Sequence, residues 1–148
     1  MAKLQNDLIG NAGVHYVAFK LALRGMIVLP TIRNTAGIDL LVYEPATGAQ
    51  ASLQVKTSQK KVKFWPTGRH GRLASGPRVF YVFLRYSKAC QTFEAYLETS
   101  AAVVARVKAN ADDYADRGRK EFTFWDLPDT LAEQEQLKHA WETWKPPQ

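Results

Sequence analysis

The order of apolar and polar positions along this chain of 148 residues predicts a helix, then several strands, then further helices. Over residues 6–24, apolar side chains recur at steps of three and four, which predicts an amphipathic helix. The predicted apolar stripe consists of Leu8, Ala12, Tyr16, Phe19 and Leu23. Asn6 or Asp7 is the expected N-terminal cap, and Gly25 follows where the helix should stop.

Short apolar runs after this helix predict a sheet of about five strands. The runs cover residues 26–30, 37–44, 50–57, 79–86 and 93–97. Residues 45–48 have the composition of a tight turn, so the second and third runs should pair antiparallel. The run at 79–86 is apolar at nearly every position, and we expect it to be a central strand that is buried on both faces.

The rest of the chain predicts helices at about 100–110 and 131–144, with a short strand or extended segment at 121–125. Ser100 is the cap candidate of the first of these helices. Helices before and after a set of strands indicate an α/β fold, with a mixed central sheet that is flanked by helices. A chain of this length forms one domain, which we expect to span residues 1–148.

Composition narrows the class of protein. A hydrophobic content of 46% and a charged content of 23% are typical of a globular protein. No apolar run is long enough to cross a membrane, and the N-terminus lacks the pattern of a signal peptide. The single Cys90 cannot form an internal disulfide, so we expect a cytoplasmic protein. No Cys and His spacing matches a zinc site.

Positive charge is concentrated in one segment. The net charge of +6 is compatible with a nucleic-acid partner, and residues 56–78 contain no Asp or Glu. The cations of this segment are Lys56, Lys60, Lys61, Lys63, Arg69, Arg72 and Arg78. Residues 58–77 form a predicted loop that would hold a nucleic-acid backbone, with Trp65 or Phe64 stacking on a base. The alternative is a solvated loop with one aromatic side chain against the core.

An acid and a Gln-x-Lys pair carry the candidate chemistry. Asp39 lies in the second apolar run, and Gln54 and Lys56 share one face of the third run because strand side chains alternate. Carboxylate and amide oxygens are ligands that Mg²⁺ accepts. A lysine beside them can stabilise phosphate charge or orient a water. The same residues also fit an ordinary hairpin with a surface Asp and a surface Lys.

These residues resemble the PD-(D/E)XK nuclease superfamily, which has the restriction-endonuclease-like fold. The matching stretch runs from Gly10 to about Ser58, and the rest of the chain matches by element order. The resemblance implies that Asp39 is the metal-binding aspartate, that Gln54 stands at the second acidic position and binds the metal through its amide oxygen, and that Lys56 is the lysine of the motif. It implies a nuclease that hydrolyses phosphodiester bonds of nucleic acid, with DNA as the expected substrate and Mg²⁺ or Mn²⁺ as the cofactor.

Val14 departs from the pattern of the family, because many members carry a Glu directly after the glycine that Gly13 matches. Since Gln54 replaces the second acid, the predicted site keeps one carboxylate of a possible three. The candidates to compensate are Asp7, Glu44 and His15. Asp7 lies about 11 Å along the helix from Val14, which makes it a poor direct substitute.

Three functions stay open on the sequence. The acid, the amide and the lysine favour a metal-dependent nuclease. Val14 and Gln54 together favour a catalytically degenerate member of the family that binds nucleic acid without cutting it, and a protein-interaction module would reuse the same fold. Trp141 and Trp144 lie one turn apart on the last helix, where they pack on the sheet or form the contact of a homodimer.

Overall fold

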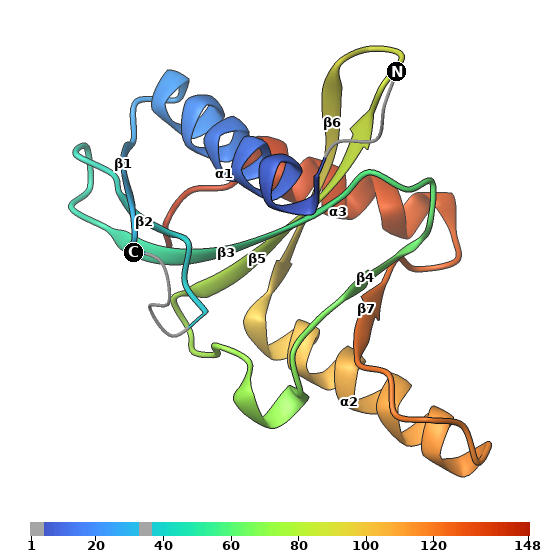
Figure 1. The fold of residues 1–148 in the computed structure, drawn as a ribbon. Coiled ribbons are helices and arrows are strands. Elements are labelled where there is room, and N and C mark those ends of the chain that lie inside the picture. The colour runs from blue at the N-terminus through green and yellow to red at the C-terminus, as the bar shows by residue number, and fades with distance from the viewer. Residues whose placement is uncertain (1–4, 33–36) are drawn as a thin grey trace.

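A computed structural model describes residues 5–32 and 37–148 and shows a mixed five-stranded sheet between helices (Figure 1). The strands are β1 (Ile27–Pro30), β2 (Leu40–Tyr43), β3 (Gln50–Ser58), β5 (Val79–Ser87) and β6 (Thr92–Thr99). They lie in the order β1-β2-β3-β5-β6. Only β3 and β5 run parallel, and the other neighbours in this sheet are antiparallel. The predicted mixed α/β fold, including the antiparallel pairing of β2 and β3, is therefore confirmed.

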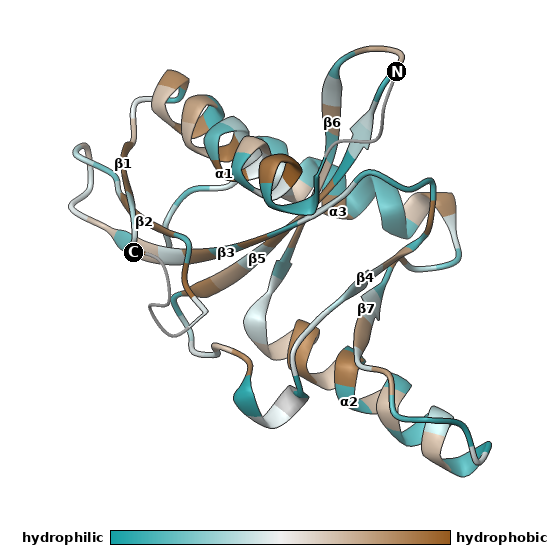
Figure 2. Ribbon diagram, viewed as in Figure 1, coloured by the Kyte–Doolittle hydropathy of each residue, from teal (hydrophilic) through white to brown (hydrophobic). Residues whose placement is uncertain are grey.

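The sheet has a core on each face. Helix α1 (Asn6–Leu23) covers one face, and helix α2 (Ser100–Asp116) covers the other. Helix α3 (Leu131–Thr143) packs along β6, with Trp141 in the core beside α1 and Leu137 against the core beside α2. β5 contributes Val82 and Leu84 to the first core and Tyr81 and Phe83 to the second. Figure 2 shows the apolar residues along this strand. The prediction of a central strand buried on both faces is confirmed, because alternate side chains enter opposite cores.

The predicted apolar stripe of α1 is wrong. The helix buries Ile9, Gly13, Val17 and Leu21, which recur every fourth residue, whereas Phe19 is 58% exposed. A Cβ added to Gly13 would lie 2.0 Å from Oγ1 of Thr57 on β3. The helix therefore approaches the sheet most closely at its glycine, and this contact decides which face is inside.

The predicted helix caps differ from those in the structure. Gln5 is the N-terminal cap of α1 and makes no capping bond with its side chain. At α2 the cap is Thr99, whose hydroxyl accepts a bond from the N–H of Ala102. The Ser100 hydroxyl bonds to the backbone of Gly76 instead. α2 also continues past residue 110 as far as Asp116, because no helix-breaking residue precedes Gly118.

Residues 58–77 are not a plain loop. They contain β4 (Phe64–Pro66), which pairs antiparallel with β7 (Phe124–Asp126), and a short 3-10 helix, η1 (His70–Arg72). Trp65 is 1% exposed. Its Nε1 donates a 2.9 Å hydrogen bond to the carbonyl oxygen of Leu84. The prediction that Trp65 stacks on a base is therefore wrong, because pairing with a distant strand turns the ring into the second core.

The last helix packs against the sheet of its own chain. α3 spans Leu131–Thr143, close to the predicted range. Trp141 and Trp144 are 4% and 7% exposed and belong to the first core. They are therefore packing residues and are not available as the contact of a homodimer. The homodimer itself stays a prediction. No helix in the described part of the chain combines the length and apolar content that a membrane span requires.

Candidate functional site

Asp39 lies directly before β2, where its backbone is held from both sides. Its N–H donates to the carbonyl of Leu53 on β3 at 2.9 Å, and its carbonyl accepts a bond from the N–H of Thr31 at 2.9 Å. The Thr31 hydroxyl donates to the carbonyl of Ile38. The segment after β1 thus fixes the start of β2, and with it the position of the Asp39 side chain.

The Asp39 carboxylate continues the ladder between β2 and β3 past the end of their backbone pairing. Oδ2 accepts a 2.7 Å bond from the N–H of Val55 and a 2.8 Å bond from Nε2 of Gln54. Oδ1 accepts none from the residues that the structure describes. The side chain is therefore fixed through one oxygen and can offer the other to a ligand.

Gln54 meets Asp39 through its amide nitrogen. Its Oε1 lies toward Gly37, 3.2 Å from the position that a Cβ on that glycine would take. The sequence predicts two oxygens side by side as metal ligands, whereas in the structure Gln54 donates to the acid. An ionised carboxylate oxygen can only accept hydrogen bonds, so a neighbouring amide turns its N–H group toward it. The structure brings the two predicted residues together in a different arrangement, and metal binding by Gln54 stays a prediction.

Lys56 lies two residues beyond Gln54 on β3, in register with Phe83 of β5. Burial lowers the pKa of its half-buried ammonium, and the charge of Asp39 raises it. Burial likewise raises the pKa of the Asp39 carboxyl, while the Val55 N–H and the Lys56 charge lower it. The acid and the lysine therefore act on each other electrostatically, and each loses its charge more easily than it would at the surface.

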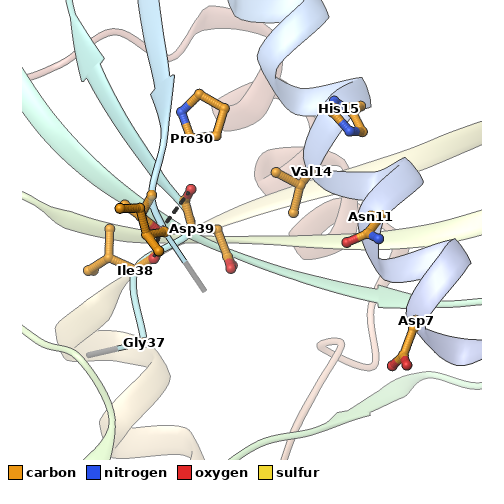
Figure 3. Close-up of a pocket in the computed structure, with 10 residues that line it drawn as sticks. Asp7, Asn11, Val14, His15, Pro30, Gly37, Ile38 and Asp39 are labelled. Atoms are coloured by element: carbon orange, nitrogen blue, oxygen red, sulfur yellow. Dashed lines mark hydrogen bonds between the residues drawn. The ribbon is translucent and has the colours of Figure 1, made fainter. Parts of the chain in front are cut away.

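A cavity of about 730 Å³ opens beside Asp39 (Figure 3). One wall is α1, which contributes Asp7, Asn11, Val14 and His15, and the other is formed around the end of β1 and by residues 37–39. In Figure 3, Val14 and Asn11 extend from the helix toward the side of Asp39. Asn11 was not predicted as a site residue. The spacing of Asp7, Asn11 and His15 at four-residue steps is the signal that places all three on one helix face.

The structure separates the three acids and bases that were candidates to compensate for Val14. Asp7 and His15 both line the cavity. Glu44 does not, because it lies at the other end of β2, where it accepts a bond from the Thr47 hydroxyl at 3.0 Å and pairs with Lys145 at 3.6 Å. Its side chain is buried, at 8% exposure. Within residues 5–32 and 37–148, no group of three or more His, Cys, Asp or Glu side chains is placed to hold a metal ion.

The predicted backbone-binding cations lie outside the cavity. Lys60, Lys61 and Lys63 follow β3, and Arg69 and Arg72 lie at η1; all five are exposed. Arg69 is 3.9 Å from Glu121. The other four make no ion pair with any residue of the described ranges. They are available to phosphates, and their role in binding stays a prediction.

No protein-family model matches this chain, and no curated protein matches it. Among solved structures, the chain is similar to a bacterial homing endonuclease, I-Ssp6803I, at 14% sequence identity and a TM-score of 0.49. The match covers 87% of this chain and 80% of that chain. A likeness of this size concerns the arrangement of helices and strands and assigns no activity.

Proposed function

We propose that this chain is a nuclease that hydrolyses phosphodiester bonds of DNA with a divalent cation bound at Asp39. The observation that carries the proposal is the Asp39 carboxylate itself. Two hydrogen bonds to Oδ2 hold it at a cavity, Oδ1 remains for a ligand, and the half-buried ammonium of Lys56 acts on it.

The oxygen donors of the site fit Mg²⁺ or Mn²⁺, although the chain supplies only a few of the ligands. Mg²⁺ is commonly bound by one or two carboxylates, with substrate phosphates and waters as its other ligands. Asp39 would supply the carboxylate oxygen, and Gln54 would add its amide oxygen if the amide turned over. A cation held there would neutralise phosphate charge and polarise the phosphoryl oxygens.

The residues of the chain would do the remaining work. Gln54 and the N–H of Val55 orient the acid. Lys56 would offset the negative charge that develops on the phosphate, and this interaction is worth more at a half-buried position than at an exposed one. Asn11, on the opposite wall of the cavity, would donate to a phosphate oxygen. The exposed cations after β3 would hold the nucleic-acid backbone.

A second candidate function is nucleic-acid binding without cleavage. The observation that favours it is the wall of α1, where Val14 lines the cavity and the described residues form no group of three or more His, Cys, Asp or Glu side chains that could hold a metal ion. Binding through Lys60, Lys61 and Lys63 needs no metal. It should weaken steeply as the salt concentration rises.

A cleavage assay separates the two candidates. Supercoiled, single-stranded and branched DNA would be incubated with Mg²⁺ or Mn²⁺ and with wild type, Asp39→Asn or Lys56→Met. Lys88→Met is the matched control, because Lys88 is an exposed lysine in the turn after β5. Cleavage that is lost in the first two variants and kept in the control supports the nuclease. Cleavage that persists in Asp39→Asn refutes it.

A further variant tests the second candidate. Val14→Glu places a carboxylate on the wall that faces Asp39. If wild type does not cut and Val14→Glu does, the wild-type chain is a binding protein whose site lacks one acid. If neither cuts any of the substrates, the nuclease proposal is wrong for them.

A further inference from the structure

A second surface, which shares no residue with the lining of the Asp39 cavity, combines aromatic rings with cations. Four rings from β4, β7, the segment before β7 and the end of α2 contact one another, and we call them the aromatic surface. They are Phe64, Tyr114, Phe122 and Phe124. Phe64 lies 5.8 Å from Phe122 and 5.7 Å from Phe124 between ring centroids. Phe122 and Phe124 stack at 5.1 Å, and Tyr114 lies 5.5 Å from Phe124.

The aromatic surface is open on one side. Phe64 is 37% exposed and Phe122 is 36% exposed. Since side chains alternate along a strand, the same pairing that turns Trp65 into the core turns Phe64 outward. Pro66, the other outward residue of β4, pairs with Phe124 of β7. The rings therefore form a cluster that is partly accessible to solvent.

The charge around the aromatic surface favours an anionic partner. Three acids near it are paired, since Glu121 lies 3.9 Å from Arg69, Asp113 lies 3.2 Å from Arg117, and Asp126 binds Arg106 through both of its oxygens. Asp116, at the end of α2, makes no ion pair with a residue in the described ranges, so one acid stands against the cations of this surface. The cations that remain are Lys63, Arg119 and Lys120. Lys63 precedes Phe64 and Lys120 lies two residues before Phe122. Neither makes an ion pair with a residue in the described ranges.

Arg119 adds a cation to the rings themselves. Its guanidinium carbon lies 5.6 Å from the centroid of the Tyr114 ring. Such a pair joins a flat apolar face to a fixed positive charge. Exposed rings beside cations are the combination with which proteins bind single-stranded nucleic acid, because bases stack on the rings and phosphates meet the charges.

We propose that the aromatic surface binds single-stranded nucleic acid, with an unpaired base on Phe64 or Phe122 and the flanking phosphates on Lys63, Arg119 and Lys120. A duplex does not offer the face of a base in this way, so the single strand is the favoured ligand. The inference rests on the proposed function and deepens it, because it states which form of nucleic acid the chain engages. None of these residues lines the Asp39 cavity, so binding and cleavage can fail separately.

Fluorescence anisotropy tests the proposal. A labelled thymidine oligonucleotide, the matching uridine oligonucleotide and a labelled duplex would be titrated with the full chain in EDTA. The chain would carry Asp39→Asn, so that nothing is cut. The single strands should bind more tightly than the duplex. Preferential binding of the duplex, or no binding of either single strand, overturns the proposal.

Two ring replacements locate the binding surface. Phe64→Leu and Phe122→Leu keep an apolar side chain, and each should weaken the single strand by about 5-fold to 150-fold, since stacking is worth about 1–3 kcal/mol per base. Phe19→Leu is the control, because Phe19 is an exposed ring on α1. Unchanged affinity in both variants, with native circular dichroism, overturns the proposal. If wild type does not cleave nucleic acid but single strands still bind, the proposed function alone is overturned.

Discussion

Replacing Gly13 with alanine should destabilise the protein, whereas the same replacement at Gly10 should stabilise it. Both glycines lie in α1. Alanine is favoured over glycine in a helix interior by about 1 kcal/mol. No atom of the described residues lies within 4 Å of a Cβ added to Gly10. Gly10→Ala should therefore keep most of this gain, about 0.5–1 kcal/mol.

At Gly13, in contrast to Gly10, an added Cβ has no free space. Its added Cβ would lie 2.0 Å from Oγ1 of Thr57 and 3.1 Å from Cδ1 of Leu84. Overpacking in a core costs about 1–3 kcal/mol, and a contact this short belongs at the upper end. After the gain in helix propensity, the net loss should be about 2 kcal/mol. The two variants should then differ by about 3 kcal/mol in the free energy of unfolding.

Urea unfolding followed by tryptophan fluorescence measures this difference, because Trp65, Trp125, Trp141 and Trp144 are all buried. The midpoints should shift in opposite directions with an unchanged m-value. Thr57→Ala in the Gly13→Ala background should recover most of the loss, since it removes the obstructing Oγ1. That hydroxyl is buried and has no hydrogen-bond partner among the residues that the structure describes.

Equal stability of the two glycine variants would refute the close approach of α1 to β3. So would a double variant with Thr57→Ala that recovers nothing, because the cost would then arise elsewhere. The test also bears on the cavity. α1 is one of its walls, so an outward shift of the helix at Gly13 moves Val14 and Asn11 away from Asp39.

Three further predictions concern Trp65, Tyr81 and Lys56. Trp65→Phe removes the donor to the Leu84 carbonyl, so the free energy of unfolding should fall by about 1–3 kcal/mol in the same urea assay. Burial raises the pKa of Tyr81 to about 12 from 10.0. Only the unfolded chain ionises this phenol between these values, so stability should fall as pH rises from 10.0 to about 12, less so in Tyr81→Phe, as measured by urea unfolding at each pH. Lys56→Met removes a charge that lowers the pKa of Asp39, so that pKa should rise further, and carboxyl NMR titration measures it.

The strands of the sheet could be predicted because their signal is local. The alternation of β3 and the apolar run of β5 contain the register and the burial in a few consecutive residues. The face of α1 could not be predicted in this way, because it depends on how closely Gly13 approaches Thr57. Trp65 was misplaced for a related reason. Its partner strand β7 lies near residue 125, and nothing in residues 58–77 indicates that pairing.

The candidate site shows the same division between local and long-range information. Strand alternation brings Gln54 and Lys56 to one face, and the turn at 45–48 brings Asp39 beside them. Which atom of the Gln54 amide faces the acid depends on the hydrogen bonds around it, and no spacing rule states that. Asn11 was missed because its relation to Asp39 exists only after α1 packs across the sheet.

Under the proposed function, the presence of Gln54 in place of a second acid beside Asp39 affects how metal and nucleic acid bind. An acid at position 54 would place a second negative charge within hydrogen-bond distance of Asp39 and would raise the pKa of the pair. Gln54 instead donates to Oδ2, so the charge of Asp39 is stabilised but the site offers the cation less negative charge. The missing ligands must then come from the phosphate of the nucleic acid and from water. Metal and nucleic acid would therefore bind cooperatively, because each supplies charge that the other needs.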